Sequence, residues 1–477
     1  MKKGDILEGV VEYTNFPNKG FLHVEDKKIG VKGVIKGQKV RFRLKKNGAE
    51  HAEGELKEVT SYSPDETECP KCPVFEQCGG CFFQRMPYEK QLETKELHVR
   101  KLLEPVITDK DYHFLPIKGS PKVYEYRNKM EFSFGDEYKG GPMVLGLHKK
   151  NSMFDLVSAA DCALVDEDVR KIVATVLSVA RESGLDFYHR TTGEGYFRHL
   201  LVRRSEKTGD ILVDVIHKSE PNGETCGQSG NEGTEKTYDS TMVESMYGKL
   251  VRELTGLHIK GKIVGILHTK NDAIADAIRN DGTEILYGTD HFTEELLGLK
   301  FRISPFSFFQ TNSLGAEVLY STVREFVGET KDKVIFDLYS GTGTIGQLLA
   351  PVAKKVVGIE IVEEAVEAAV MNASENGLSN CEFLAGDVLK MIDTVTDKPD
   401  FIVLDPPREG INPKALPKII DFGVERMVYI SCKPTSLAND LITLQEAGYH
   451  VVCVQPVDMF PETVHVETIV GLQRVDT

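Results

Sequence analysis

Two short apolar runs in the last third of the chain constrain its fold most strongly. Phe401–Leu404 and Met427–Ile430 are continuous, β-branched runs of the kind found in strands that a parallel sheet buries on both faces. Each run ends in a polar corner, which reads Asp405-Pro406-Pro407-Arg408 in one case and Ser431-Cys432-Lys433-Pro434 in the other. Ligands of open α/β sheets bind beyond the carboxyl ends of the strands. We therefore expect both corners to face one site.

The region around these runs alternates between strands and helices. Val334–Leu338 is predicted as a strand, followed by a glycine turn, a helix that ends near Ala353 and a second strand at Lys355–Glu360. Residues 332–477 continue this alternation after a predicted helix at Ser313–Val327. Such a repeat predicts an α/β fold in which a doubly wound, Rossmann-like parallel sheet carries helices on both faces.

The N-terminal segment has a different pattern. Residues 5–59 contain four or five short alternating runs separated by Gly, Asn and Pro turns, which predicts a small antiparallel barrel of the oligonucleotide-binding type. Residues 1–50 have a net charge of +6, whereas the whole chain is at −15 and its remainder therefore at −21. Basic strands suit a phosphate backbone, although a solvated lysine-rich surface explains the same charges equally well.

The middle of the chain is rich in short strands and predicts an α+β region, which an amphipathic helix at 87–104 precedes. The runs Tyr126–Phe134 and Phe197–Arg204 mix aromatic and basic residues, which can hold splayed RNA or can be arginines opposite a packed face. The polar segment Ser219–Thr237 predicts a long loop. We place the predicted domains at residues 1–60, 61–295 and 296–477.

Hydropathy and cysteine usage limit the cellular environment. The sequence has neither a transmembrane run nor a secretory leader, so we expect a cytoplasmic protein that does not bind membranes. Nine cysteines in such a chain point to metal binding or catalysis rather than to disulfides.

Four of the cysteines fall within thirteen residues, at Cys69, Cys72, Cys78 and Cys81. The Gly79-Gly80 pair permits a tight turn that aims the flanking thiols inward. Clustered thiolates select zinc or an iron–sulfur cluster, and the spacing alone does not decide between them. A zinc site would close on these four thiols, whereas an iron–sulfur cluster could recruit the distant Cys162.

The turn after the first predicted strand reads Tyr339-Ser340-Gly341-Thr342-Gly343-Thr344-Ile345-Gly346, and Glu360 follows nineteen residues after its first glycine. By itself this pattern is also that of a dinucleotide site, in which an acid binds ribose hydroxyls. Together with Asp337 before the turn and the Asp405 corner, it resembles S-adenosylmethionine-dependent methyltransferases. In that class an acid at the end of the third strand, here Asp387, meets the adenine amino group.

Cys432 and the near-terminal Glu467 can be combined into a mechanism. C5 of a pyrimidine is a weak nucleophile, but a thiolate that adds to C6 makes C5 able to take a methyl group. A base must then remove the C5 proton so that the cysteine can leave. We expect Lys433 and a helix at Thr435–Gln445 to favour the Cys432 thiolate, and burial to raise the pKa of Glu467. The alternative roles are a buried structural thiol and a structural acid.

Six ordered motifs resemble those of the RNA uridine-5-methyltransferase family, and most of all its iron–sulfur ribosomal-RNA branch with an N-terminal TRAM module. The motifs are Cys72-x5-Cys78-Gly79-Gly80-Cys81, Phe308–Asn312, Asp337–Gly343, Asp405–Arg408, Ser431–Pro434 and His465–Thr468. The resemblance covers essentially the whole chain. It implies that residues 1–60 are a TRAM module and that the C-terminal domain binds S-adenosylmethionine.

The resemblance also implies roles for single residues. Cys432 would be the nucleophile and Glu467 the base, while Phe308 would either stack on a flipped uracil or pack in the core. The cofactor would contact Gln310, Tyr339, Gly341, Gly343, Glu360, Asp387 and Asp405, although the family often has Asn at the place of Asp387. A 4Fe–4S cluster would be held by Cys72, Cys78, Cys81 and Cys162, which leaves Cys69 as an extra thiol.

The resemblance favours 23S ribosomal RNA as the substrate of a monomeric enzyme, because the transfer-RNA branch typically lacks the cysteine cluster and the TRAM module. Three alternatives remain at this point. They are a transfer-RNA uridine-5-methyltransferase, an amino-group methyltransferase that needs no thiol, and a metal-bearing RNA-binding protein with a degenerate cofactor site.

Overall fold

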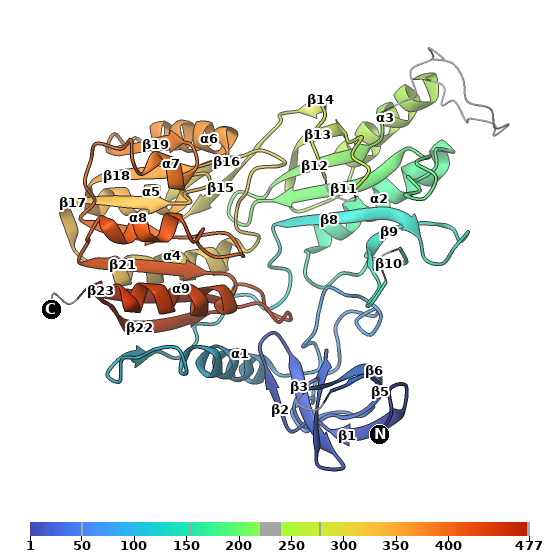
Figure 1. The fold of residues 1–477 in the computed structure, drawn as a ribbon. Helices are drawn as coiled ribbons and strands as arrows, with labels where there is room; N and C mark the ends of the chain where they lie inside the picture. Colours follow the sequence, from blue (N-terminus) through green and yellow to red (C-terminus); the bar gives the residue numbers. More distant parts are fainter. Residues whose placement is uncertain (49–50, 153, 220–239, 276–277, 475–477) are drawn as a thin grey trace, which may run out of the picture. The chain divides into compact units, whose positions relative to one another are not determined.

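The computed structural model describes residues 1–48, 51–152, 154–219, 240–275 and 278–474 (Figure 1). Backbone contacts divide the chain into two compact units. The first comprises Met1–Pro70, Cys81–Val123 and Leu314–Thr477, and the second comprises Lys71–Gly80 and Tyr124–Ser313. The predicted loop lies outside the described residues from residue 220 onward. The boundaries between the three predicted domains stay a prediction.

The first strands of unit one form a six-stranded sheet around an apolar core of their own. The strands are β1 (Ile6–Val10), β2 (Tyr13–Asn15), β3 (Lys19–Val24), β4 (Lys27–Lys32), β5 (Lys39–Asn47) and β6 (Ala52–Ser61). Their order is β1-β5-β6-β4-β3-β2, and only β4 and β6 pair in parallel. Alternate residues of β5, namely Val40, Phe42 and Leu44, are buried, as in a sheet with one packed face. That this sheet is a TRAM barrel stays a prediction.

The rest of unit one is built on an eight-stranded sheet. Its strands are β7 (His113–Phe114), β17 (Thr330–Leu338), β18 (Ala353–Glu360), β19 (Cys381–Ala385), β20 (Phe401–Leu404), β21 (Arg426–Ser431), β22 (Tyr449–Val457) and β23 (Glu467–Arg474). The order is β19-β18-β17-β20-β21-β23-β22-β7. The first five strands in this order are parallel, while β23 runs antiparallel to both of its neighbours. The predicted α/β fold is confirmed, with one reversed strand.

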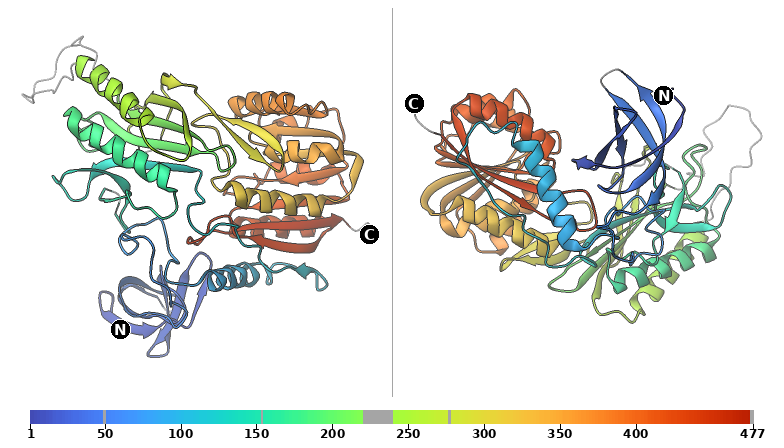
Figure 2. Two further views of the ribbon diagram at one scale, coloured as in Figure 1. Left: turned by 180° about the vertical axis from the view of Figure 1, so that it is seen from behind. Right: turned by 90° about the horizontal axis from the view of Figure 1, so that it is seen from below.

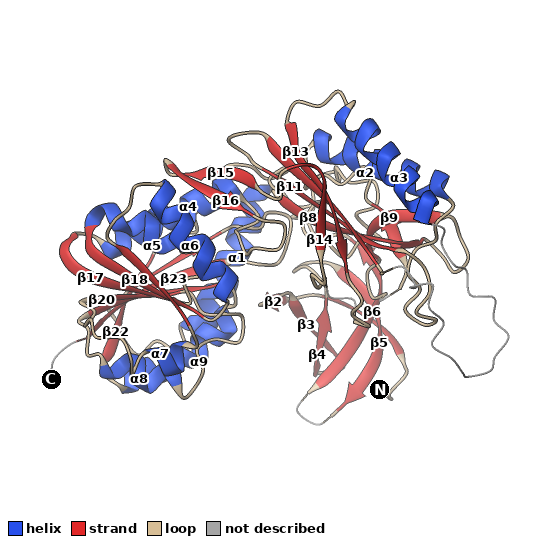
Figure 3. Ribbon diagram, turned by 90° about the horizontal axis from the view of Figure 1, so that it is seen from above, coloured by secondary structure: helices blue, strands red, loops and turns tan. Residues whose placement is uncertain are grey.

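Helices cover both faces of this sheet. They are α1 (Tyr88–Leu103), α4 (Ser313–Val327), α5 (Thr344–Leu349), α6 (Glu363–Glu375), α7 (Val388–Met391), α8 (Ala415–Asp421) and α9 (Pro434–Glu446), with a 3-10 turn at Ala350–Val352. Helices α4, α5 and α6 lie on one face and α7, α8 and α9 on the other (Figure 3). All four residues of β20 are therefore buried, which explains its uninterrupted apolar sequence. Helix α1 packs beside α9 (Figure 2).

The described residues of the second unit form a seven-stranded sheet, a two-stranded sheet and two helices. The elements are β8 (Lys129–Asp136), β9 (Met143–His148), β10 (Leu156–Ser158), α2 (Glu167–Ser183), β11 (Phe197–Arg204), β12 (Asp210–His217), α3 (Ser240–Thr255), β13 (Lys262–Lys270), β14 (Thr283–Gly288), β15 (Phe292–Leu296) and β16 (Leu299–Ile303). The larger sheet has the order β10-β9-β8-β11-β12-β13-β14, and β15 pairs with β16. Helices α2 and α3 lie side by side (Figure 3).

Within the described ranges, no helix is long and apolar enough to span a membrane.

Candidate active site

The register between β21 and β23 brings Cys432 and Glu467 together. Ser431 pairs with Thr468 in this antiparallel ladder, so the residue after Ser431 lies next to the residue before Thr468. The side chains also interact, because charge on Glu467 raises the pKa of the Cys432 thiol. The predicted nucleophile and the predicted base are therefore neighbours at one edge of the sheet.

Parallel register places further predicted residues along the same edge. Leu338 of β17 pairs with the equivalent residues near the ends of β18 and β20. The next residue of each strand, namely Tyr339, Glu360 and Asp405, therefore stands in one row. Asp387 follows β19 and begins α7, where its carboxylate accepts a hydrogen bond from a backbone amide at 2.9 Å. These side chains come from four neighbouring strands of one sheet.

Two carboxylates hold the glycine turn between β17 and α5. Asp337 accepts a hydrogen bond from the Gly346 amide at 2.8 Å, and Glu360 accepts one from the Gly341 amide at 2.9 Å. The backbone at Gly341 and Gly343 has φ values of +53° and +71°, a left-handed conformation that glycine adopts without strain. The glycines thus shape the turn, and the acids fix it.

Several buried polar atoms at this turn lack a hydrogen bond to any described residue. The Asp337 Oδ1 atom and the hydroxyl groups of Tyr339 and Ser340 have no hydrogen bond within the part of the chain that the structure describes. Tyr339 also adopts a left-handed φ of +68°, which is unusual for a residue with a side chain. Buried polar groups are nearly always hydrogen-bonded, so these atoms fit a polar ligand bound at the turn.

Three buried acids at the site have raised pKa values. Burial and the negative charge of Asp405 raise the pKa of Glu467 to about 8, as the sequence predicts in direction. Burial and the charge of Asp337 raise the pKa of Asp405 to about 7, and burial raises that of Asp337 to about 7 as well. A cation bound among these three carboxyl groups would be stabilised by their ionised forms.

The environment of Cys432 differs from the predicted one. Burial and the charges of Glu467 and Asp405 raise the pKa of its thiol to about 11. The expectation that Lys433 favours the thiolate is wrong, because Lys433 is exposed and does not affect the thiol. The cation that does act on the sulfur is Arg408, which lowers the thiol pKa through its charge and a hydrogen bond.

Sequence reasoning gave no role to Arg408 or to a second pair beside the site. Arg408 directly follows Asp405-Pro406-Pro407. Its place at this corner is the sequence feature from which a role in the site could have been predicted. The Tyr429 hydroxyl donates a hydrogen bond to Asp440 at 2.6 Å, and the same carboxylate accepts one from the Ile411 amide at 2.9 Å. This pair ties β21 to α9 and to the loop after β20, on either side of Cys432.

Gln310 and Phe308 lie in the second unit. The Gln310 carbonyl accepts a hydrogen bond from the Asn128 side chain at 2.8 Å, which anchors this segment within the unit. Phe308 is 67% exposed, so the alternative that it packs in a core is wrong. The roles of both residues toward cofactor and RNA stay predictions.

Three of the four cysteines predicted to hold a cluster lie in the second unit. Cys72, Cys78 and Cys162 of the second unit are buried. Burial, and to a smaller extent charge on Cys72, raises the thiol pKa of both Cys78 and Cys162. Cys81 belongs to the first unit and Cys69 is exposed. Over the described ranges, no three His, Cys, Asp or Glu side chains are arranged to hold a metal ion. The 4Fe–4S site on Cys72, Cys78, Cys81 and Cys162 therefore stays a prediction.

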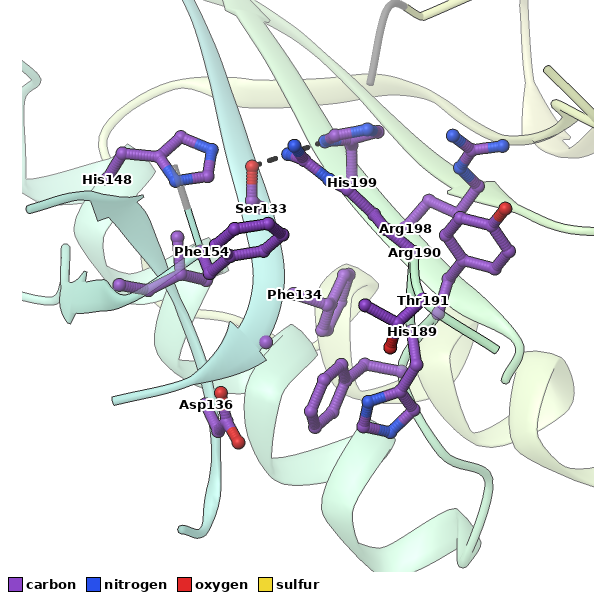
Figure 4. A pocket seen from close by; sticks show the side chains of 14 residues that line it. Ser133, Phe134, Asp136, His148, Phe154, His189, Arg190, Thr191, Arg198 and His199 are labelled. Carbon is purple, nitrogen blue, oxygen red and sulfur yellow. Dashed lines mark hydrogen bonds between the residues drawn. The ribbon is translucent and has the colours of Figure 1, made fainter. Parts of the chain in front are cut away.

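A separate cavity of about 120 Å³ lies in the second unit (Figure 4). Its walls include Arg190, Arg198, His148, His199 and the largely exposed Phe154. Figure 4 shows His199 beside Ser133, whose hydroxyl lies 3.4 Å from the imidazole Nδ1. Burial and the nearby arginines lower the pKa of His199 to about 4 and that of His148 below its usual range.

Two arginines of the predicted RNA-binding run Phe197–Arg204 hold the fold. Arg198 is 3% exposed and donates hydrogen bonds to three backbone carbonyls of residues 271–275. Arg203 is 1% exposed and donates to the carbonyls of Pro305 and Ser307. Their guanidinium groups are thus used inside the second unit rather than presented to a phosphate backbone.

Comparison with known proteins identifies the class of protein to which this fold and this candidate site belong. Residues 267–475 match the family model described as tRNA (uracil-5-)-methyltransferase. An uncharacterized RNA methyltransferase of Clostridium tetani is 48% identical over 477 residues, which cover 100% of this chain and 99% of the relative. One of Caldanaerobacter subterraneus subsp. tengcongensis is 46% identical over 472 residues, with 99% of each chain covered.

The chain belongs to the RNA (uracil-5-)-methyltransferase family, which confirms the resemblance at the level of the family, while the iron–sulfur ribosomal-RNA branch stays a prediction. A solved structure with a similar fold is the Pyrococcus abyssi tRNA (uracil-54, C5)-methyltransferase in complex with S-adenosyl-L-homocysteine. The TM-score is 0.72 at 22% identity, and the match covers 98% of this chain and 100% of that one. At this identity the likeness is one of fold.

Proposed function

We propose that this protein methylates C5 of a uridine in RNA with S-adenosylmethionine as the methyl donor. The observation that carries the proposal is the β21–β23 register, which sets Cys432 beside Glu467. A thiol and a carboxyl side by side are what C5 methylation requires, whereas an amino-group methyltransferase needs no thiol.

The chemistry follows from these two side chains. The Cys432 thiolate adds to C6 of the uracil, and the electron pair of the C5–C6 double bond moves onto C5. C5 would then take the methyl group of S-adenosylmethionine as the methyl–sulfur bond breaks, and the electron pair of that bond would stay on the sulfur of the released S-adenosylhomocysteine. The Glu467 carboxylate then removes the C5 proton, the double bond re-forms, and the C6–S bond breaks to return the thiolate. Arg408 favours the thiolate in both half-reactions, because its cationic group acts on the sulfur.

The cofactor would be held at the edge of the sheet by Tyr339, Glu360, Asp387 and Asp405, with the turn at Gly341 and Gly343. S-adenosylmethionine supplies an electrophilic methyl group on a positively charged sulfur. The cluster of carboxyl groups with raised pKa values supports this proposal, because a positive charge in their midst stabilises the ionised acids. The same charge would lower the pKa of the Cys432 thiol.

We propose 23S ribosomal RNA as the substrate, with transfer RNA as the second candidate. The cysteine segment and the basic first fifty residues support the ribosomal-RNA assignment through the resemblance described above. The family description that names transfer RNA favours the second candidate. Arg190, which lines the cavity in the second unit, offers the RNA a further positive charge.

The cysteines carry a separate proposal. A 4Fe–4S cluster on Cys72, Cys78, Cys81 and Cys162 would require the side chains to close around it, since they form no metal-binding group as they stand. Burial of three of the thiols supports the proposal. Iron and acid-labile sulfide in anaerobically purified protein, lost in Cys162→Ser, would support the cluster, and stoichiometric zinc would contradict it.

Methyl transfer tests the main proposal. The protein is incubated with methyl-labelled cofactor and either 23S ribosomal-RNA or transfer-RNA transcripts, and the RNA is digested to nucleosides. Label in 5-methyluridine from the ribosomal transcript is expected, with none from Cys432→Ala. Label in a methylated amino group would favour the amino-group alternative. Absence of cofactor binding and of label would favour an RNA-binding protein with a degenerate site.

A further inference from the structure

The segment between β22 and β23, residues 458–466, delivers the base Glu467 to the site. Val457 pairs with Glu467, so the segment closes a loop between two paired residues. Asp458, at one end of this loop, is fully buried, and Glu462 near its middle is 1% exposed. A loop with buried polar residues needs internal partners, and these come from helix α1.

Three polar side chains on one face of α1 point inward. Tyr88, Gln91 and Lys95 are three and four residues apart, which places them in one row along the helix. Gln91 and Lys95 are each 1% exposed. An amphipathic surface helix normally turns such residues to water. The burial of this row therefore indicates that its side chains bind polar groups inside the protein.

Lys95 and Tyr88 hold the first part of the loop. The Lys95 ammonium group donates hydrogen bonds to the Asp458 carboxylate at 2.7 Å and to the Phe460 carbonyl at 3.0 Å. The Tyr88 hydroxyl donates to the other Asp458 oxygen at 3.0 Å. The carboxylate in turn accepts a hydrogen bond from the Phe460 amide at 3.1 Å. The ion pair therefore fixes both a side chain and the backbone of the loop.

Gln91 holds the second part of the loop. Its amide oxygen accepts a hydrogen bond from the Glu462 amide at 3.1 Å, and its amide nitrogen donates to the Glu462 carboxylate at 3.1 Å. Glu462 has a left-handed φ of +67°, which a residue with a side chain keeps only when its surroundings enforce it. The Glu462 carbonyl also accepts hydrogen bonds from the Phe82 and Phe83 amides at 2.6 Å and 3.1 Å.

We propose that Gln91 and Lys95 are positioning residues for Glu467, and that they serve the second half of the reaction, in which the C5 proton is removed. The inference rests on the proposed function. Cys432 comes from a different strand, so this loop does not position the nucleophile. Moving the Glu467 charge away from the sulfur would lower the thiol pKa, so displacement of the loop does not slow adduct formation. A base displaced by about 1 Å loses on the order of 100-fold in rate, because proton transfer needs hydrogen-bond distance.

Gln91→Met tests the proposal, because methionine keeps the length of the side chain but makes neither hydrogen bond to Glu462. Enzyme is mixed with methyl-labelled cofactor and substrate RNA, and label is followed both in free RNA and in a denaturant-stable protein–RNA complex. Resolution of the complex is expected to slow about tenfold or more, while its formation is not slowed. The complex should therefore accumulate. Lys95→Met/Asp458→Asn, which removes the ion pair without leaving a lone charge, should do the same.

Two controls separate positioning from folding. Val99→Ala creates a cavity under the same helix at a fully buried position, and it should lower stability without accumulating the complex. Glu467→Gln should accumulate the complex most strongly. If Glu467→Gln gives none, the proposed function fails, and this inference fails with it. If Glu467→Gln accumulates it but Gln91→Met slows formation and resolution equally, or behaves like Val99→Ala, only the positioning role is overturned.

Discussion

Replacing the buried base by its neutral isostere should make the protein more stable, and the gain should depend on pH. Burial raises the pKa of Glu467 from 4.5 to about 8. The folded protein therefore holds this proton more tightly than the unfolded chain does, and stability is lost as pH rises from the unfolded toward the folded pKa. By linkage the loss reaches about 1 kcal/mol at pH 5 and about 3 kcal/mol at pH 7. Glu467→Gln does not show this loss, because its amide does not ionise.

The assay is urea unfolding of wild type and Glu467→Gln at the two pH values, followed by a signal from the first unit. The difference in unfolding free energy between variant and wild type should grow by about 2 kcal/mol from pH 5 to pH 7. Glu367→Gln, on the exposed face of α6, is the matched control and should show no such growth. An offset that is the same at both pH values would refute the reasoning, because it would mean that the carboxyl is not strained by burial.

Three further predictions follow from the same structure. Because Glu467 must be ionised to remove the C5 proton, the rate at which the methylated covalent complex is resolved should rise with pH up to about 8, and a resolution rate that stays flat below that pH would argue against this role. Lys95→Met alone should cost about 3–5 kcal/mol of unfolding free energy by leaving Asp458 buried and unpaired, and adding Asp458→Asn should recover much of it; equal melting of single and double variants would contradict the pairing. Arg190→Ala should weaken RNA binding and make its logarithmic salt dependence shallower by about 1, and an unchanged slope would exclude a phosphate contact at the cavity.

The fold could be predicted where a strand or helix carries its own pattern. β20 occupies the predicted Phe401–Leu404 and α4 the predicted Ser313–Val327, because a strand buried on both faces and a long amphipathic helix show in the local sequence. The reversed direction of β23 and the two-residue edge strand β7 have no such pattern. Pairing across the sheet decides both.

The site was predictable in its residues but not in its electrostatics. Cys432 and Glu467 stand at strand ends, so sequence order and strand logic suffice to bring them together. The thiol pKa depends instead on charges that two separate segments contribute, the Asp405–Arg408 corner and Glu467, and the exposed Lys433 is not among them. The role of the buried row on α1 could not be predicted from the sequence either, because its partners Asp458 and Glu462 lie more than 360 residues away along the chain.

The central claim is that Cys432 bonds to the pyrimidine, and one measurement tests it most directly. Substrate RNA that contains 5-fluorouridine is incubated with the protein and S-adenosylmethionine. Fluorine in place of the C5 proton prevents the base from completing the reaction, so a covalent complex should persist through denaturation. After proteolysis, mass mapping should place the modified nucleotide on the peptide that contains Cys432, and Cys432→Ala should give no complex. A nucleotide attached to any other residue, or no complex with active wild-type protein, would contradict the account.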